Sequence, residues 1–283
     1  MNAKEQIDFA RDMVNEATAA HWSNSNLLKR LNAAQARIAL RVAQSPGQWL
    51  VKSASVTPVA SVITLPADCA KPLYLEETAT GGVIQWLGSV THRRVSRGTG
   101  VLWSTDGSQE AYPLLNTIEV NVSSYTTACT LWYLIRVPDL HLGTAMTSTG
   151  ASALELDDDE YKLALSFVDD YYNGVIVEVY DATSGIVDIR SEISDYAAST
   201  HIAVISGTAA ADDTYATISR LPEETHYLMV LEAAVSAMAK PSSNIDKDVW
   251  KMMKYELKEE RETVYEWAAS RIPGGGTQIG SYS

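Results

Sequence analysis

The sequence predicts an α+β protein, in which a discontinuous terminal α-helical domain carries a β-rich domain and a second, acidic β module inserted between its helices. Three observations support this fold class. Apolar residues recur at helical spacing at both ends of the chain, the period shifts towards two in between, and most of the negative charge lies in one stretch. With 283 residues, 46% of them apolar, the chain is long enough to bury more than one core.

Changes in composition predict six segments along the chain. They are an N-terminal helical hairpin (1–45), a β-rich domain (46–143), a small and polar linker (144–153), the acidic β module (154–215), the C-terminal helices (216–273) and a flexible tail (274–283). Because helices stand at both ends, we expect the two terminal segments to pack together as one domain.

The N-terminal segment is predicted to contain two helices joined as a hairpin. The apolar positions at helical spacing are Ile7, Ala10, Val14 and Ala17 in the first helix, and Leu27, Leu31, Ala34, Ile38 and Val42 in the second. Ser23 is placed to cap the second helix, and Pro46-Gly47 ends it.

The β-rich domain alternates between apolar and polar residues from Trp49 to about Leu142. The predicted strands are 55–57, 62–65, 73–75, 117–122 and 130–135, with turns at Pro66-Ala67-Asp68, Gly81-Gly82 and Thr105-Asp106-Gly107. The chain has two cysteines, Cys69 and Cys129, and both fall in this region. Two are too few for a disulfide framework, so free buried thiols are predicted.

The acidic β module stands out by its charge. Residues 146–215 carry 14 acidic and 2 basic side chains, which accounts for −12 of the net charge of −13. Strands are predicted at 174–180, 186–193 and 202–205, with hairpin-type turns at Asn173-Gly174 and Ser184-Gly185 and a closing loop at 207–214. So sharp a difference from its neighbours favours a separately folding module of three or four antiparallel strands.

Helical periodicity returns near the C-terminus. Pro222 fits the first position of a helix that presents Tyr227, Leu231, Ala234 and Met238 on one face and stops before Pro241. Asn244 or Asp246 is expected to cap a longer helix whose inward residues are Val249, Met253, Leu257, Val264 and Ala268. That helix ends at Pro273, and the glycine-containing tail after it is expected to become ordered only on a partner.

No catalytic motif is present, so we predict no enzyme and no cofactor. The sequence lacks a Gly-x-Ser-x-Gly elbow, a P-loop and a dinucleotide fingerprint. The histidines, His21, His92, His141, His201 and His226, are scattered without a metal-binding spacing. A pair of glycosidase carboxylates cannot be recognised among 35 acidic residues.

One acidic cluster leaves a calcium site open as an alternative. The run Asp157-Asp158-Asp159-Glu160 could be joined in space by Asp169-Asp170 and Asp212-Asp213. Hard cations need several converging carboxylates, but this spacing does not match an EF-hand. We therefore favour a solvated acidic surface and predict no metal.

Charge and hydropathy also restrict the partners. A net charge of −13 repels phosphate, which argues against specific nucleic-acid binding. The basic patch Arg93, Arg94 and Arg97 is interpreted as a solvated loop, with contact to a phosphate or an acidic neighbour as the alternative. No apolar run is long enough to span a membrane, and the charged N-terminus does not resemble a signal peptide, so we expect the chain to remain where it is made.

Aromatic composition favours subunit interfaces. There are 14 tyrosines against 2 phenylalanines, and tyrosine provides apolar area together with a hydroxyl that tolerates a wet contact. Trp49, Trp86, Trp103 and Trp132 are interpreted as β-core or interface anchors, and Tyr171-Tyr172 opens the acidic β module.

Three stretches carry a resemblance to a known family: His21 to Gln35, with Trp22-Ser23 before a helix containing Leu31-Asn32-Ala33-Ala34-Gln35; Leu65-Pro66-Ala67-Asp68 before the strand Leu73-Tyr74-Leu75; and Ala237 to Asp246 before a charged helix. They resemble the head-to-tail adaptor (connector) proteins of tailed bacteriophages. A fourth stretch, Asp169 to Gly174 with Gly185 and Ile193-Ser194-Asp195-Tyr196, resembles a small β module found in phage structural proteins.

The resemblance implies a virion structural protein that forms a ring of about twelve copies below the portal and lines the DNA exit channel. Its implied partners are the portal protein, a downstream tail or nozzle protein, further copies of itself, and double-stranded DNA that passes without specific binding. It implies assembly in the host cytoplasm and a final place in the virion neck. Residues implied to dock on the portal are Arg271, Ile272, Pro273, Gly274, Gly275, Gly276, Ile279 and Tyr282.

Two other classes stay open at this point. One is another phage structural subunit, for tail completion or fibre anchoring. The other is a non-viral β-rich ligand-binding module. The same composition suits all three classes, which differ in their neighbours.

Overall fold

The computed structural model describes residues 1–16, 22–86, 110–114, 116–120, 125–145, 152–157, 165–239 and 247–270. The chain forms two compact units, one made of Met1–Trp49 with Val137–Ser283 and the other of Leu50–Arg136. Helices lie at both ends and strands between them, which confirms the predicted α+β class. Each unit is described by itself.

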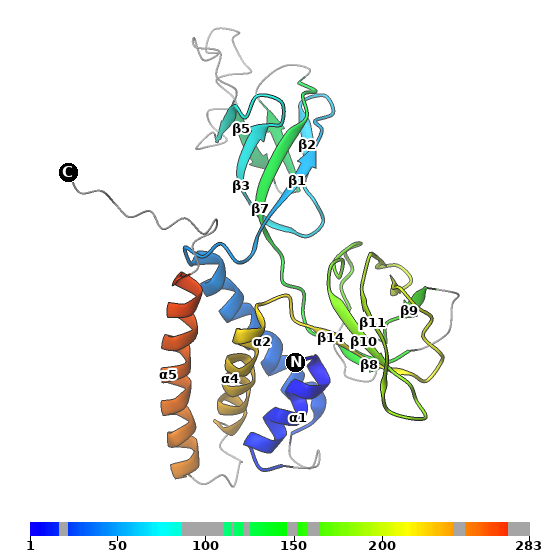
Figure 1. Cartoon of the computed structure of the whole chain (residues 1–283), viewed down its shortest axis with the longest axis vertical. Coiled ribbons are helices and arrows are strands. Elements are labelled where there is room, and N and C mark those ends of the chain that lie inside the picture. Colours follow the sequence, from blue (N-terminus) through cyan, green and yellow to red (C-terminus); the bar gives the residue numbers. More distant parts are fainter. Residues whose placement is uncertain are drawn as a thin grey trace, which may run out of the picture. The chain divides into compact units, whose positions relative to one another are not determined.

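The helices of the first unit form a bundle around one central member (Figure 1). The bundle comprises α1 (Ala3–Met13), α2 (Asn24–Gln44), a short 3₁₀ turn η1 (Glu223–Thr225), α4 (His226–Met238) and α5 (Lys247–Ser270). Helix α4 contacts α1, α2 and α5. The terminal segments therefore pack together, as the sequence predicted.

Helix α2 closely follows its sequence pattern. The Ser23 hydroxyl accepts a hydrogen bond from the N–H of Asn26 at 3.2 Å, so the predicted N-cap is confirmed. The five predicted apolar positions, Leu27, Leu31, Ala34, Ile38 and Val42, are all fully buried. Burial of this stripe fixes the face that α2 presents to the bundle.

Three details of the other helices differ from the prediction. Helix α1 ends at Met13 and Val14 is its C-cap, because Asn15 adopts a left-handed backbone conformation with φ of 53°. Pro222 is extended and precedes the 3₁₀ turn, so it is not the first residue of α4. Val249 is 39% exposed, so it is wrong as an inward position of α5, whereas Met253, Leu257, Val264 and Ala268 are buried.

Some predicted helix features lie outside the described residues. They are Ala17, the capping residues Asn244 and Asp246, Pro241, and everything after Ser270.

The first unit also contains two small antiparallel sheets. The larger has the order β11 (Val187–Glu192), β10 (Ile176–Tyr180), β14 (Thr214–Ile218) and β8 (Leu142–Thr144), and the smaller has the order β12 (Asp195–Ala197), β13 (Ile202–Val204) and β9 (Ala153–Glu155). Side chains such as Leu154, Val177, Val179, Tyr196 and Tyr215 form their common core.

Strands β10, β11 and β13 confirm predicted strands of the acidic β module, whereas β8, β9, β12 and β14 were not predicted. Gly185 has a φ of 67° in the turn that joins the paired strands β10 and β11, so the predicted hairpin turn at Ser184-Gly185 is confirmed. Gly174 has a φ of 79°, but β9, the described strand before it, lies in the other sheet, so the prediction of a hairpin at Asn173-Gly174 is wrong. Strands β8, β9 and β12 are only three residues long, too short to establish an alternating pattern. Strand β14 begins at Thr214, the last residue of the predicted closing loop.

The second unit is one seven-stranded sheet with the order β1 (Val51–Val56), β7 (Cys129–Ile135), β3 (Cys69–Glu77), β4 (Val83–Trp86), β5 (Glu110–Leu114), β6 (Thr117–Val120) and β2 (Val62–Thr64). Among the described strands of this unit, every pairing is antiparallel except that of β4 with β5. Strands β2, β3, β6 and β7 confirm predicted strands, and β1 starts four residues before the predicted 55–57 and ends at Val56.

The core of this sheet contains both cysteines. Cys69 and Cys129 are free and buried, as predicted. Burial is the main cause that raises the pKa of the Cys69 thiol to about 11. Trp132 instead lies on the outer face, 39% exposed and opposite Tyr74 on β3, so it is not part of the core.

Candidate functional site

The sequence resembles a component of a larger assembly. Its candidate functional sites are therefore the polar contacts that hold segments of the chain together, which we call joints, and the surfaces that remain exposed. The predicted portal-docking residues from Arg271 to Tyr282 lie outside the described residues. So do Arg93, Arg94, Arg97, Trp103, Thr105-Asp106-Gly107, His21 and His92. Asp158, Asp159 and Glu160 do as well, and nothing is described of the Trp86 side chain.

The Leu65-Pro66-Ala67-Asp68 stretch is a turn that ties three strands together. The Asp68 carboxylate accepts hydrogen bonds from the Lys52 ammonium at 2.9 Å and the Tyr133 hydroxyl at 2.8 Å. Its carbonyl accepts from the Arg136 N–H at 2.6 Å. Lys52 lies on β1, and Tyr133 on β7. The acidic residue of this motif therefore fixes the start of β3 against the adjacent strand β7 and against β1, the next strand beyond it.

The Leu31-Asn32-Ala33-Ala34-Gln35 stretch binds a backbone segment of the same unit. The Asn32 amide donates to the carbonyl of Leu140 at 3.0 Å, and its oxygen accepts from the Leu140 N–H at 2.7 Å. One turn along α2, the Gln35 amide donates to the carbonyl of Pro138 at 2.7 Å. Both side chains are buried, so these bonds are shielded from water. They clamp the segment that leads into β8.

The loop before α2 is held by a buried arginine. The Arg11 guanidinium donates to the carbonyl of Trp22 at 2.7 Å and to the side-chain oxygen of Asn24. The Glu16 carboxylate lies 3.6 Å from the same guanidinium and accepts the N–H of Trp22. The polar residues around Trp22 thus serve to join α1 to α2.

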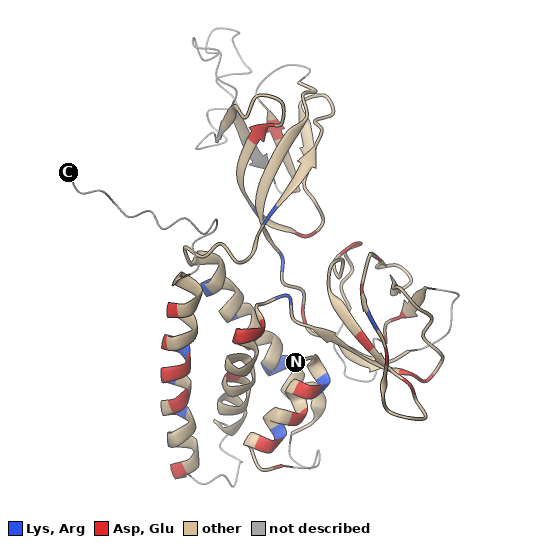
Figure 2. Cartoon of the chain, viewed as in Figure 1, with Lys and Arg blue, Asp and Glu red and all other residues tan. Residues whose placement is uncertain are grey.

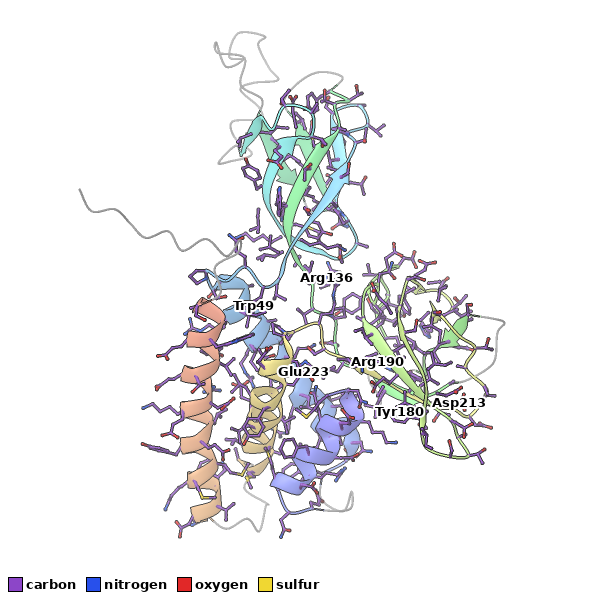
Figure 3. All side chains as sticks on the ribbon, in the orientation of Figure 1. Trp49, Arg136, Tyr180, Arg190, Asp213 and Glu223 are labelled. Atoms are coloured by element: carbon purple, nitrogen blue, oxygen red, sulfur yellow. The ribbon has the colours of Figure 1, made fainter. Side chains whose placement is uncertain are left out.

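A buried asparagine joins α1 to the larger sheet. The Asn2 side-chain oxygen caps α1 by accepting the N–H of Glu5 at 2.9 Å. Its amide donates to the Glu178 carboxylate and the Tyr180 hydroxyl on β10, each at 2.5 Å. Arg190 on β11 lies 3.5 Å from the other oxygen of Glu178. Figure 3 shows Tyr180 and Arg190 on this sheet.

Another joint crosses the middle of the helical bundle. The Glu232 carboxylate on α4 is 4% exposed, in an otherwise apolar helix. It lies 3.3 Å from the Arg37 guanidinium of α2 and accepts a hydrogen bond from Arg261 of α5. Two cations thus satisfy one buried anion, which would otherwise be costly to bury. The sequence signal was available, since Glu232 interrupts the longest apolar run.

Two described aspartates of the acidic β module bind backbone groups. Asp213 accepts the N–H groups of Ala182 and Ala210, at 3.0 and 2.8 Å. Asp169 accepts the N–H of Ala198 at 2.9 Å. Burial and a hydrogen bond with Asp195 raise the pKa of the Asp170 carboxyl. Among the described residues no three His, Cys, Asp or Glu side chains gather as a metal site.

Two of the described histidines, His141 and His226, are buried, and Trp49 packs against the bundle. His141 is buried, stacks on Tyr215 and shares a 3.0 Å hydrogen bond with its hydroxyl. Burial is the main cause that lowers the pKa of His226. Trp49 stacks on Trp267 of α5 with ring centres 4.2 Å apart. A side chain at Gly47 would clash with the Ala268 carbonyl, so glycine is required there.

A small cavity of about 120 Å³ lies where α1 meets the larger sheet. Lys4 and Asp8 line it from the helix, and Gly143 and Tyr215 from the strands. It is below the size of ordinary ligand pockets, which begin at about 300 Å³. None of the described helices is both long and apolar enough to cross a bilayer.

The described residues thus define an α+β protein in which buried polar joints hold the segments of each unit together. The family model described as SU10 adaptor protein matches residues 1–178. The chain therefore belongs to this family of phage head-to-tail adaptors, and the resemblance found in the sequence is confirmed. No curated protein matches the sequence.

Proposed function

We propose that this phage structural adaptor forms a ring of about twelve copies below the portal and lines the channel through which DNA leaves the head. It assembles in the host cytoplasm and resides in the neck of the virion, between the portal protein and a downstream tail or nozzle protein. It carries out no catalysis and needs no cofactor or metal.

The family match carries this proposal, because it spans α1, α2, all of the second unit and the first part of the acidic β module. The joints support it. Asn32, Gln35 and Asp68, which lie in the stretches that resemble adaptors, hold chain segments in place instead of facing a pocket. Polar residues that fix the fold in this way are expected in a structural protein that transmits force between neighbouring proteins of an assembly.

Charge supports passage of DNA without binding. A protein that holds the phosphate backbone must neutralise it with cations, whereas this chain has a net charge of −13. A negative wall keeps the duplex mobile. We propose that DNA is cargo and not a ligand, so that retention on a DNA column should stay at background level even at low salt.

We further propose that the tail from Arg271 docks on the portal, as the resemblance implies. Deleting residues 273–283 removes none of the described core, so the midpoint of thermal unfolding should stay unchanged. Binding to purified portal rings should be lost. A control that replaces Thr277 and Gln278 by serine should bind as the full chain does, and undiminished binding by the truncated chain would overturn the docking role.

Residues 154–215 are proposed to fold as a self-contained module that is fastened to α1 through Asn2. Replacing residues 154–210 by a short glycine linker should leave the helical circular dichroism signal in place. Loss of that signal would show that the module belongs to the folding core of the helices.

The adaptor role is tested by mixing the purified chain with portal rings and measuring the mass of the complex. We expect about one adaptor chain per portal subunit, since a ring matched to the portal repeats its contacts. If the chain does not bind portal rings but binds completed tails, it is instead a tail-completion or fibre-anchoring subunit.

A further inference from the structure

Helix α5 exposes a wide surface that the bundle does not use. Its inward residues are Met253, Leu257, Val264 and Ala268, which lie on one side of the helix. On the other side Met252 is 64% and Tyr255 67% exposed. Side chains three positions apart are neighbours on a helix surface, so Met252 and Tyr255 form one exposed apolar stripe. Contiguous apolar surface that stays exposed often marks a contact.

Charges of opposite sign line the two edges of this surface. Each residue turns a helix by about 100°, which places Lys247, Lys251, Lys254 and Lys258 within one sector of about 60°. The exposed acidic residues Asp248, Glu256, Glu259, Glu262 and Glu266 fall in a second sector of about 120°, which begins roughly 20° beyond the first. Met252 and Tyr255 lie within this second sector. Figure 2 shows both signs along α5. We name these groups the basic edge and the acidic edge.

Glu256 accepts a hydrogen bond from the Tyr227 hydroxyl of α4, and the fold makes little use of the other charges on the two edges. Lys251 pairs with Asp248 at 3.0 Å and Lys258 approaches Glu262 at 4.0 Å, all on the same helix. Their side chains are 66–87% exposed, and ion pairs of this kind contribute little to stability. Contacts within the bundle therefore do not explain why the basic and acidic side chains of α5 are separated into two edges.

We propose that the outer face of α5 is a contact between copies of this chain, with the basic edge of one α5 against the acidic edge of the α5 in the next copy. This inference rests on the proposed ring. A heterologous contact needs two different, complementary surfaces on each subunit, and the two edges of α5 provide them. Met252 and Tyr255 become covered at the contact.

The charges also select the orientation. Neighbouring α5 helices that run parallel bring opposite edges together. An antiparallel pair related by a two-fold axis would place like edges face to face, and like charges in contact suppress association. A partner that is a second copy explains why both signs occur on one helix, since a single acidic or basic partner would need only one.

Charge reversal tests the contact. The first variant carries Lys251→Glu and Lys258→Glu, so that both edges are acidic. The second carries Asp248→Lys and Glu259→Lys, so that both are basic. The control carries Lys29→Glu and Lys71→Glu, which make the same change in net charge as the first variant at exposed positions on α2 and β3. Thermal unfolding midpoints establish that all variants fold.

The readout is self-association in sedimentation, as mass against concentration. Each reversed variant should associate at least about tenfold more weakly than the wild type, and the control should not. An equimolar mixture of the two variants should recover association, because acidic and basic copies then alternate. Recovery in the mixture is the result that a merely structural role cannot produce.

Three outcomes would overturn the inference: a wild-type chain that stays monomeric up to millimolar concentration, reversed variants that associate like the wild type, or a mixture that stops at two chains. None of these touches the portal-binding measurement, so failure of this contact is distinguishable from failure of the adaptor role.

Discussion

Helices α4 and α5 lie side by side in one bundle, yet they are built for different tasks. In α4, 11 of 13 residues are buried, whereas in α5 only 4 of 24 are. A helix that is apolar all round forms a core, and a helix with one apolar stripe covers it. Helix α4 therefore contributes more to the stability of the bundle, while most of the surface of α5 remains exposed for other contacts.

The largest effect is expected for a truncation in α4. Leu231 is fully buried, so Leu231→Ala should lower the free energy of unfolding by about 2–5 kcal/mol through lost burial and a cavity. Denaturant unfolding followed by circular dichroism measures it. The matched change in α5, Met252→Ala, should cost less than about 0.5 kcal/mol. If Leu231→Ala and Met252→Ala lower the free energy of unfolding equally, α4 does not contribute more to stability than the outer face of α5.

Sequence reasoning anticipated this division only in part. The apolar period of α5 correctly predicted Met253, Leu257, Val264 and Ala268. It failed at Val249, because the first turn of a helix can extend past the elements it packs on, and periodicity carries no information about where the neighbours end. For α4 a single face was predicted, whereas neighbours surround it on several sides.

The partners that residues bind in the long-range polar joints could not be predicted. Asn2 and Glu178 are 176 positions apart, and no local pattern pairs them. Strands β8 and β14 could not be predicted either, because they pair with each other across a long stretch of sequence and no local pattern shows that pairing. The stretches that resemble adaptors did point to Asp68, Asn32 and Gln35, though not to what they bind.

The second prediction concerns the end of α5 that is fixed to the loop after α2. Gly47→Ala should cost about 1–3 kcal/mol, because the added methyl group meets the Ala268 carbonyl and disturbs the stack of Trp49 on Trp267. Tryptophan fluorescence during unfolding reports it. Gly82→Ala, which would meet mainly the end of the flexible Thr80 side chain, is the control and should be nearly neutral.

The third prediction tests the ion pair that joins α4 to its neighbours. Glu232→Gln removes the charge between Arg37 and Arg261 and should lower the free energy of unfolding by about 1–3 kcal/mol. Glu223→Gln, at an exposed position labelled in Figure 3, is the matched control and should change it by less than about 0.5 kcal/mol. If both changes cost the same, the buried joint contributes nothing specific.

The smallest effect on stability is expected at the exposed stripe of α5. Tyr255→Ser should leave the unfolding free energy within about 0.5 kcal/mol of the wild type, because the ring is 67% exposed. The same variant should weaken association between copies. A destabilised monomer would show that Tyr255 belongs to the bundle.

A reconstruction of the virion neck tests the central claim most directly. We predict a closed ring of about twelve copies of this chain directly below the portal, with α5 of each copy against that of its neighbour. One or two copies at that vertex, or a location away from the neck, would contradict it.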